Sequence, residues 1–333
     1  MFSLLLSLCV QFATHTFASD PHYQRLQTPS YYQLAWGDLR HKKNFSQHPW
    51  PFTVLSIGHS NASLQAYGAV EENYFHHGLD IRGVSRDKIY ASTGGYVVNV
   101  ENYIPGNYLY WEIAILDNEG FLWQYHHIAK DSIPTAIWNA FRNKTAISSG
   151  EYMGEIVPWP VYTFGEYFHH VHLNILDKDG NYLSPFLFLK PLPDIQTPKI
   201  HKIALYQNGR VVEGNSISGN YTMVLNADDL IGHDKFLVPP HIIMINIDKA
   251  GPKVLWNFAT LPGGASREQY VNKFFLPPSC GDYHCRNFFM NLGFVQDETQ
   301  SLSRLGQGKH LMEVAIYDFV GNYDYAQFEW EVR

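Results

Sequence analysis

Apolar and polar residues alternate with a period of two along much of the chain, a pattern typical of β-strands. In one such segment Val171, Leu173 and Ile175 fall on one face of a predicted strand, and His170 and His172 fall on the other. The apolar face predicts packing against a core. The opposite face presents its two imidazoles about 7 Å apart along the strand.

The same periodicity predicts further strands and one helix. Strand-like segments lie at 52–58, at 63–70, at 88–100 and, as a hairpin around a polar turn, at 108–128. The helix is predicted over 132–141, where Ser132 can cap the first turn and the apolar residues have helical spacing. The pattern therefore favours a mainly β protein.

A proline-rich stretch divides the chain into two predicted domains. Residues 191–198 begin and end with proline and predict a stiff linker. Beyond it, short strands and turns recur over 199–333, and a hairpin is predicted near the C-terminus. Regularly spaced strands of this kind predict an immunoglobulin-like β-sandwich. The chain has 333 residues, which is long enough for two domains.

The N-terminal segment predicts export. Residues 1–18 form an apolar run without an acidic residue and end in Thr-Phe-Ala, which is typical of a signal peptide. A membrane anchor is the alternative, but the run is short for a span and contains His15. We therefore expect a periplasmic or secreted protein with no stable membrane span after signal removal.

Composition narrows the set of partners. The formal net charge is −7 and there is no basic run, so binding to nucleic acid or anionic lipid is disfavoured.

Two cysteines follow the signal segment, Cys280 and Cys285, and in an exported protein they predict a local disulfide. A zinc knuckle through His284 is the alternative, but it lacks a fourth nearby ligand.

Histidines and an aspartate form a candidate zinc site. His76 and Asp80 are four residues apart, and Gly78 between them favours a loop or strand end over a helix. With His172 they would supply two imidazoles and a carboxylate, leaving a fourth position for water, as catalytic zinc requires. A hydrolase also needs groups that move protons, and His170 and the Tyr125-His126-His127 segment could provide imidazoles for that purpose.

These residues carry a family resemblance. The segment His76-His77-Gly78-Leu79-Asp80 resembles the H-x-G-x-D signature of the lysostaphin/LytM-type zinc endopeptidases, and His170-Val171-His172 resembles their H-x-H. Between them, Ala91 with Gly95 and Val97 resembles the family's Ala-x-x-x-Gly-x-Val strand, and Tyr125–Ile128 resembles its Tyr-x-His-Leu. The match covers about residues 50–190, and the order of four separate motifs makes it specific.

The resemblance implies a role for each residue. One zinc ion per chain would be bound by His76, Asp80 and His172, with His127 and His170 as the flanking catalytic imidazoles. It further implies an antiparallel β-sheet peptidase domain over 51–190 that hydrolyses peptide cross-links of bacterial peptidoglycan. The neighbouring histidines would have structural or solvent-facing roles; they are His77, His126 and His169.

Two departures from the family pattern concern substrate choice. Family members have small residues before H-x-H, whereas this chain has Glu166-Tyr167-Phe168-His169, and the predicted helix at 132–141 resembles an insertion.

The main alternative function is a catalytically silent module of the same fold that binds cell wall or activates a partner hydrolase. The C-terminal domain could likewise be a spacer or a module that binds wall or protein.

Two further hypotheses involve histidines outside the motifs. The His-Val-His segment is also found in copper–zinc superoxide dismutases and cupins, which would require additional ligands downstream; the candidates are His201, His233 and His241. Residues 19–50 form a predicted N-terminal arm without periodicity. This arm could inhibit the site by offering a fourth ligand, from His41, Asn44 or His48.

Overall fold

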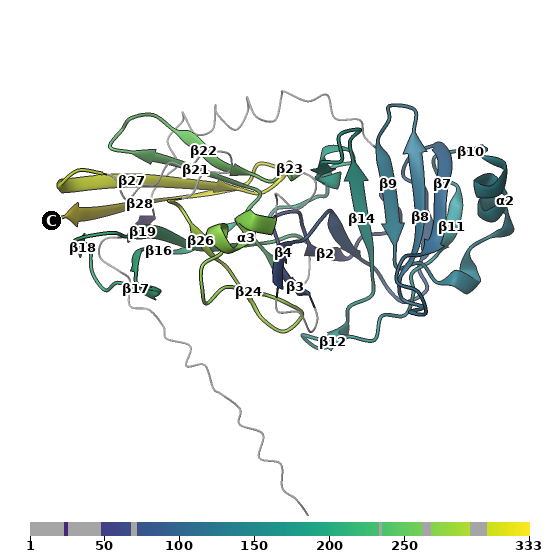
Figure 1. Ribbon diagram of the computed structural model, residues 1–333, viewed down its shortest axis with the longest axis horizontal. Coiled ribbons are helices and arrows are strands. Elements are labelled where there is room, and N and C mark those ends of the chain that lie inside the picture. The colour runs from purple at the N-terminus through teal and green to yellow at the C-terminus, as the bar shows by residue number, and fades with distance from the viewer. Residues whose placement is uncertain (1–22, 26–47, 68–71, 233–234, 262–267, 294–304) are drawn as a thin grey trace, which may run out of the picture.

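The protein was analysed as a computed structural model, which describes residues 23–25, 48–67, 72–232, 235–261, 268–293 and 305–333 (Figure 1). The predicted signal peptide and most of the N-terminal arm, including His41 and Asn44, lie outside the described residues, as does His233. The expectation of a mainly β protein built from antiparallel sheets is confirmed.

The first region of the molecule is built on one sheet. Among the described residues this sheet has nine strands in the order β10-β7-β8-β9-β14-β15-β23, with β5 beside β14 and β2 beside β5, and all its pairs are antiparallel. Its strands are β2 (Ser56–His59), β5 (Leu79–Arg82), β7 (Gly95–Asn102), β8 (Trp111–Asp117), β9 (Leu122–His126), β10 (Ala146–Ile147), β14 (His170–Leu176), β15 (Tyr182–Leu183) and β23 (Thr260–Leu261).

Strand β14 has the two faces that its sequence predicts. Val171, Leu173 and Ile175 are fully buried in the core of the first region. The opposite face carries His170 and His172 into a pocket that is described below. The predicted hairpin over 108–128 is also confirmed, because β8 and β9 pair antiparallel around the turn at 117–120.

Short elements complete the first region. They are the hairpin of β3 (Leu64–Tyr67) and β4 (Glu72–Phe75), the pair β6 (Lys88–Tyr90) and β11 (Tyr152–Glu155), the hairpin of β12 (Tyr162–Thr163) and β13 (Glu166–Tyr167), the 3₁₀ turns η1 (Lys130–Ser132) and η2 (Pro185–Leu187), and the helix α2 (Thr135–Asn143). The predicted helix is present, but it starts after Pro134, and the Ser132 hydroxyl donates to the Ala129 carbonyl instead of capping it.

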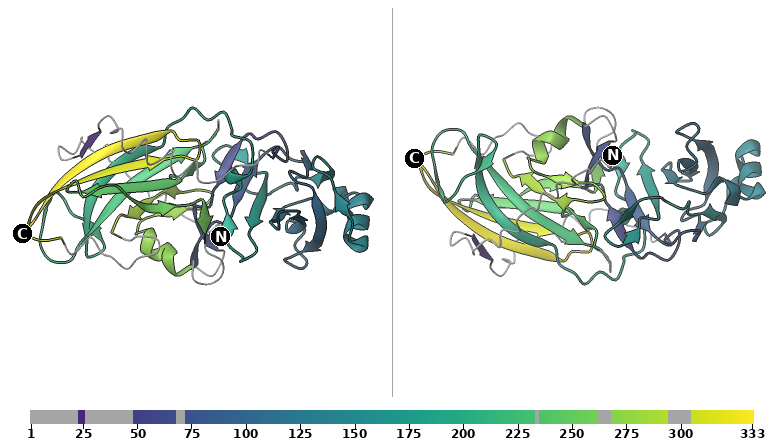
Figure 2. Two further views of the ribbon diagram at one scale, coloured as in Figure 1. Left: turned by 90° about the horizontal axis from the view of Figure 1, so that it is seen from above. Right: turned by 90° about the horizontal axis from the view of Figure 1, so that it is seen from below.

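The second region consists of two facing sheets with a shared apolar core (Figure 2). One has the order β1-β28-β27-β21-β22 with β18 beside β28, and the other β17-β16-β19-β20 with β26 beside β19. The elements are β1 (Tyr23–Arg25), β16 (Lys199–Gln207), β17 (Arg210–Val211), β18 (Ser216–Ile217), β19 (Thr222–Leu230), β20 (Leu237–Val238), β21 (Ile242–Ile247), β22 (Lys253–Asn257), β24 (Cys280–Gly281), β25 (Arg286–Asn287), β26 (Phe289–Asn291), β27 (Gly308–Tyr317), β28 (Tyr323–Val332) and the helix α3 (Glu268–Phe274).

The C-terminal hairpin follows its predicted pattern. Phe328 and Trp330 are buried and Glu329 between them is exposed, as a half-buried antiparallel strand requires. Strand β1, from the N-terminal arm, pairs with β28. The immunoglobulin-like assignment of this region stays a prediction.

The two regions share part of their cores. Phe75, at the end of β4, packs against Trp256 and Phe274 of the second region. In the other direction, β23 extends the nine-stranded sheet by pairing with β15. The second region is therefore packed directly beside the strands that carry the histidines.

Candidate metal centre

Neighbouring strands align five polar residues in one row across the nine-stranded sheet. Asp80 of β5 lies opposite His172 of β14 on one side and opposite His59 of β2 on the other. His172 in turn lies opposite His126 of β9, and His126 opposite Glu112 of β8. Directly opposite residues have their Cβ atoms about 5 Å apart, so the register alone brings these side chains into contact.

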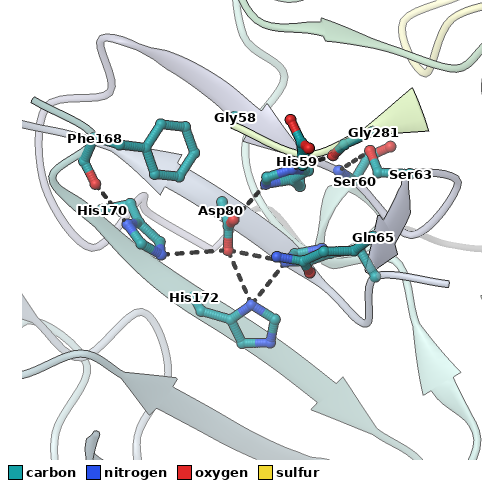
Figure 3. Close-up of polar contacts among 12 residues, drawn as sticks. Gly58, His59, Ser60, Ser63, Gln65, Asp80, Phe168, His170, His172 and Gly281 are labelled. Carbon is teal, nitrogen blue, oxygen red and sulfur yellow. Dashed lines mark hydrogen bonds and ion pairs between the residues drawn. The ribbon is translucent and has the colours of Figure 1, made fainter. Parts of the chain in front are cut away.

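Three potential ligand atoms converge near the middle of this row. His76 Nε2 lies 3.0 Å from Asp80 Oδ1, and His172 Nδ1 lies 2.9 Å from the same oxygen. The two imidazole nitrogens are 3.0 Å apart. Figure 3 shows Asp80 at the centre of the cluster, with His170 and His172 on one side and His59 on the other. The structure thus brings together the three residues predicted to bind zinc.

Local backbone geometry explains how His76 and Asp80 meet. His76 follows the end of β4, Asp80 lies within β5, and Gly78 turns the chain between them with φ +79°. A Cβ atom at Gly78 would lie 2.0 Å from the carbonyl oxygen of Leu173, so only glycine fits against β14 here. The prediction that this segment is a loop and strand end, not a helix, is confirmed.

Hydrogen bonds orient one of the ligand imidazoles. His172 Nε2 donates to the side-chain oxygen of Asn174 at 2.9 Å, which places the proton on Nε2 and leaves the lone pair of Nδ1 facing Asp80 and His76. Partners of this kind fix the tautomer of metal-binding histidines. The Nδ1 atom of His76 is buried and makes no hydrogen bond within the described part of the chain.

The donor set fits a zinc ion. A tetrahedral zinc site with bonds of about 2.0–2.1 Å places neighbouring ligand atoms about 3.3 Å apart. The three distances of 2.9–3.0 Å are within a few tenths of an ångström of that spacing. Two imidazoles and a carboxylate are also a ligand set that zinc hydrolases use. That His76, Asp80 and His172 bind zinc stays a prediction.

The two other predicted site residues flank this cluster. His170 Nδ1 donates to the carbonyl oxygen of Phe168 at 2.8 Å, and His127 Nδ1 donates to that of Leu109 at 2.9 Å. Each ring therefore keeps Nε2 for another partner, and His170 Nε2 lies 3.8 Å from Asp80 Oδ1. The two ring centroids are 4.7 Å apart. Their catalytic role stays a prediction.

An unusual backbone conformation places His127 beside the cluster. Its φ of +67° is uncommon for a residue with a side chain and interrupts the strand alternation immediately after β9. As a result both His126 and His127 line the pocket, with ring centroids 5.2 and 6.1 Å from that of His172. Strained residues of this kind are concentrated at functional sites.

Burial keeps the imidazoles neutral while Asp80 remains ionised. Desolvation lowers the pKa of His76 to about 3 and that of His170 to about 4. Burial alone would raise the pKa of Asp80, but the surrounding imidazoles, His76 foremost, hold it well below its usual range. Neutral imidazoles and a carboxylate are the forms that bind a metal ion.

The cluster opens into a pocket of about 310 Å³. Its wall includes Tyr103, Tyr110 and Trp159 from the first region and Tyr283 from the second. The side chain of His172 is 15% exposed, whereas Asp80 is only 2% exposed. His172 therefore reaches the accessible surface of the pocket whereas Asp80 lies beneath it, an arrangement that suits a site with one position open for a substrate.

Sequence reasoning missed His59. Its Nδ1 atom lies 2.6 Å from Asp80 Oδ2, so His59, His76 and Asp80 form an alternative group of potential metal ligands. We favour the group with His172 as the ligand set, because His59 is completely buried and would leave an ion no open position. In the sequence His59 directly follows the strand-like segment 52–58. Its place at the site could have been predicted only by pairing that strand with the one that carries Asp80.

Other histidines that the sequence singled out lie elsewhere. His48 contacts the carbonyl oxygen of Ser92 and the ring of Trp123, so the hypothesis that it supplies a fourth ligand is wrong for this structure. The ring of His77 stacks on Tyr182, and His169 accepts a hydrogen bond from the backbone of Trp159.

The downstream histidines do not join the cluster. His201 pairs with Asp228 near the surface, and the half-buried ring of His241 packs against Phe319. The predicted disulfide between Cys280 and Cys285 is confirmed, which removes the zinc-knuckle alternative. No helix in the described part of the chain is long and apolar enough to cross a membrane.

Comparison with known proteins gives only distant similarities. No family model and no curated protein matches the chain. Among solved structures, Csd3 of Helicobacter pylori aligns with a TM-score of 0.32 and 14% identity over 44% of this chain and 36% of its own. A LytM protein of Ruminococcus gnavus, named as a glycyl-glycine endopeptidase, gives 0.27 and 17% over 50% and 76% of the two chains.

A third structure, dimeric latent PorU of Porphyromonas gingivalis, aligns with a TM-score of 0.27 and 11% identity over 85% of this chain and 24% of its own. The chain therefore spans about a third of the length of Csd3 and about a quarter of that of PorU. These similarities are partial and concern the fold alone.

Proposed function

We propose that the protein is an exported zinc endopeptidase that hydrolyses peptide cross-links of bacterial peptidoglycan. The observation that carries the proposal is the convergence of His76 Nε2, Asp80 Oδ1 and His172 Nδ1 within 3.0 Å of one another at the base of a pocket. Two imidazoles and a carboxylate that share one small volume are a set of groups that a divalent cation stabilises. The resemblance of the four sequence motifs supports the choice of reaction.

Each residue would have a distinct task. His76, Asp80 and His172 would hold the zinc ion, which when bound polarises a carbonyl group and lowers the pKa of water to about 7. His170 is held by Phe168 so that its neutral Nε2 faces the cluster and can accept a proton. His127 would stabilise the oxygen on which charge develops by donating from Nε2, and because Nδ1 already donates to Leu109 the ring must first take up a proton at Nε2.

Substrate and location belong to the same proposal. The pocket wall combines the imidazoles with aromatic and amide side chains, among them Tyr110, Gln124 and Asn174, which suits a polar peptide. A disulfide between Cys280 and Cys285 is compatible with an oxidising compartment such as the periplasm or the medium.

The test combines metal content with cell-wall digestion. We expect the purified protein to bind zinc and to reduce the turbidity of isolated sacculi, and a chelator to abolish the reduction. His170→Ala should abolish digestion and retain zinc, whereas His172→Ala should lose both. Muropeptide analysis of the digested sacculi would identify the bond that is cut.

Three outcomes would redirect the proposal. Sacculi that are bound but not cut by the zinc-loaded protein would favour the silent-module alternative. Digestion that is unaffected by the chelator would contradict a zinc enzyme. Zinc bound equally by wild type and by His172→Ala would contradict the ligand set.

A further inference from the structure

A loop of the second region contacts the candidate metal centre. The disulfide between Cys280 and Cys285 closes this loop, which joins β24 to β25 and which we call the disulfide loop. The carbonyl oxygen of Gly281 lies 3.2 Å from His59 Nε2. Figure 3 shows Gly281 next to His59, on the side of the ring that faces away from Asp80. A single imidazole therefore separates the disulfide loop from a predicted zinc ligand.

His59 contacts Asp80 through the oxygen that the other ligands do not use. Its Nδ1 atom donates to Asp80 Oδ2 at 2.6 Å, whereas His76 and His172 both face Oδ1. A neutral ring that donates from Nδ1 to Asp80 has no second proton for the Gly281 carbonyl, so the fully buried His59 ring is held by the Asp80 hydrogen bond and by packing against the disulfide loop. A donor on the second oxygen of a carboxylate fixes the direction in which the first oxygen points.

Close packing at Gly281 makes the contact specific. A Cβ atom at this position would lie 1.9 Å from the carbonyl oxygen of Leu64, so a side chain would push the loop away from β3. Arg286, just after the disulfide, donates from Nη1 to the carbonyl oxygens of Gly58 and Leu237. The loop is thus fastened to the residue that precedes His59.

The disulfide loop also supplies part of the pocket wall. Tyr283 lines the pocket, and its ring packs edge-on against Phe168 with centroids 5.0 Å apart. Its carbonyl oxygen accepts a hydrogen bond from the hydroxyl of Thr163, on the hairpin that precedes the His-Val-His segment. The loop therefore touches β2 and the segment just before β14, and these two strands pair with β5, which carries Asp80.

We propose that the disulfide loop of the C-terminal region is a working part of the metal centre: its tightly packed Gly281 keeps the His59 ring in place, and His59 orients Asp80 toward the zinc ion. His59 is a positioning residue, because it acts on the ion through Asp80. The inference rests on the proposed function, and it assigns the C-terminal region a task other than that of a spacer or wall-binding module.

Substitutions at His59 separate its two contacts. The amide nitrogen of His59→Asn can replace Nδ1 and donate to Asp80, whereas that of His59→Gln replaces Nε2 and reaches only toward Gly281. Zinc affinity of the full-length chain is measured by competition with a chromophoric chelator. We expect His59→Ala and His59→Gln to lower it about 10- to 100-fold, as loss of a partner of a metal ligand does, and His59→Asn to restore most of it.

Substitution at Gly281 tests the loop itself. Gly281→Ala should lower zinc affinity in the same direction as His59→Ala, because the carbonyl moves away from the ring. Gly306→Ala is the matched control, since a Cβ atom there meets nothing within 4 Å and Gly306 is also in the second region. The control should bind zinc as tightly as the wild type.

The outcomes distinguish this inference from the proposed function. Wild-type protein that binds no zinc would overturn both. If the wild type binds zinc and His59→Ala and His59→Gln bind it just as tightly, the inference alone is overturned. If Gly281→Ala does not fold, the decision rests on the His59 variants. The inference expects His59→Asn to keep most of the zinc affinity and His59→Gln to lose it. Equal losses of zinc affinity in His59→Asn and His59→Gln would contradict the inference.

Discussion

Two buried carboxylates, Asp80 in the first region and Glu313 in the second, have opposite kinds of surroundings. Glu313 Oε1 accepts hydrogen bonds from the Tyr325 hydroxyl at 2.6 Å and from Gln327 Nε2 at 3.2 Å, and Oε2 accepts one from Asn246 Nδ2 at 2.6 Å. Donors and acceptors match. Around Asp80 Oδ1, by contrast, two imidazole nitrogens approach to within 3.0 Å of each other as well as of the oxygen.

The difference lies in what each cluster needs for stability. A buried polar network whose members are all hydrogen-bonded contributes to a unique packed structure without a ligand. A cluster of two imidazoles and a carboxylate that share one small volume can gain further stability from a bound cation. The Glu313 cluster is therefore structural, and the Asp80 cluster has the ligand set that we propose binds zinc.

The sharpest test of this comparison is removal of one ligand. His172→Ala should lower zinc affinity by more than about 100-fold, because loss of an outer partner alone costs about 10- to 100-fold. The metal-free protein should also become less stable, because the variant loses the hydrogen bond from His172 Nε2 to the buried Asn174 side chain and the loss of a typical hydrogen bond costs about 1 kcal/mol. Calorimetric titration with zinc and urea denaturation in chelator measure the two effects.

The converse test removes Glu313. Glu313→Ala leaves the Tyr325, Gln327 and Asn246 groups without their acceptor, and a buried unsatisfied group costs about 1–3 kcal/mol. We expect the free energy of unfolding to fall by about 3 kcal/mol and zinc affinity to remain unchanged. A loss of zinc affinity in Glu313→Ala with stability retained would contradict the comparison.

The sequence predicted the ligand cluster better than its surroundings. The alternation around His170 and His172 identified a strand with one polar face, and Gly78 identified a turn, because both features depend on local backbone geometry. The family resemblance chose His76 over His77, and the structure places His76 beside Asp80 and His77 on Tyr182.

What the sequence did not predict depends on strand order and on contacts between distant segments. His59 reaches Asp80 because β2 pairs with β5, and Gly281 reaches His59 across more than two hundred residues of chain. Local periodicity contains no information about either contact. The positive φ of His127, which turns two consecutive imidazoles toward one pocket, likewise depends on tertiary packing.

Acid sensitivity gives a smaller effect that reports on the buried imidazoles. Burial lowers the pKa of His76 and of His241 to about 3 and that of His170 to about 4, from 6.5 in the unfolded chain. The unfolded state therefore binds more protons below that value, and stability that is present above it is lost as the pH falls.

For each such imidazole the free energy of unfolding should decrease by up to about 1.4 kcal/mol per pH unit below about pH 6.5. Urea denaturation of the metal-free protein at a series of pH values measures this slope. His241→Phe, outside the metal centre, should reduce the slope by one proton and leave zinc affinity unchanged. An unchanged slope in that variant would show that His241 is not neutral in the fold.

The smallest expected effect distinguishes two adjacent histidines. His76 contacts Asp80 within the cluster, whereas the His77 ring stacks on Tyr182 with centroids 4.4 Å apart. His77→Phe keeps an aromatic ring for this stacking and removes the nitrogens, so zinc affinity should change by less than about 3-fold, well below the 10- to 100-fold cost of losing a partner of a metal ligand. A larger loss in the same chelator competition would mean that the cluster extends to His77, and that the boundary between ligand-binding and structural imidazoles lies one residue further along the chain.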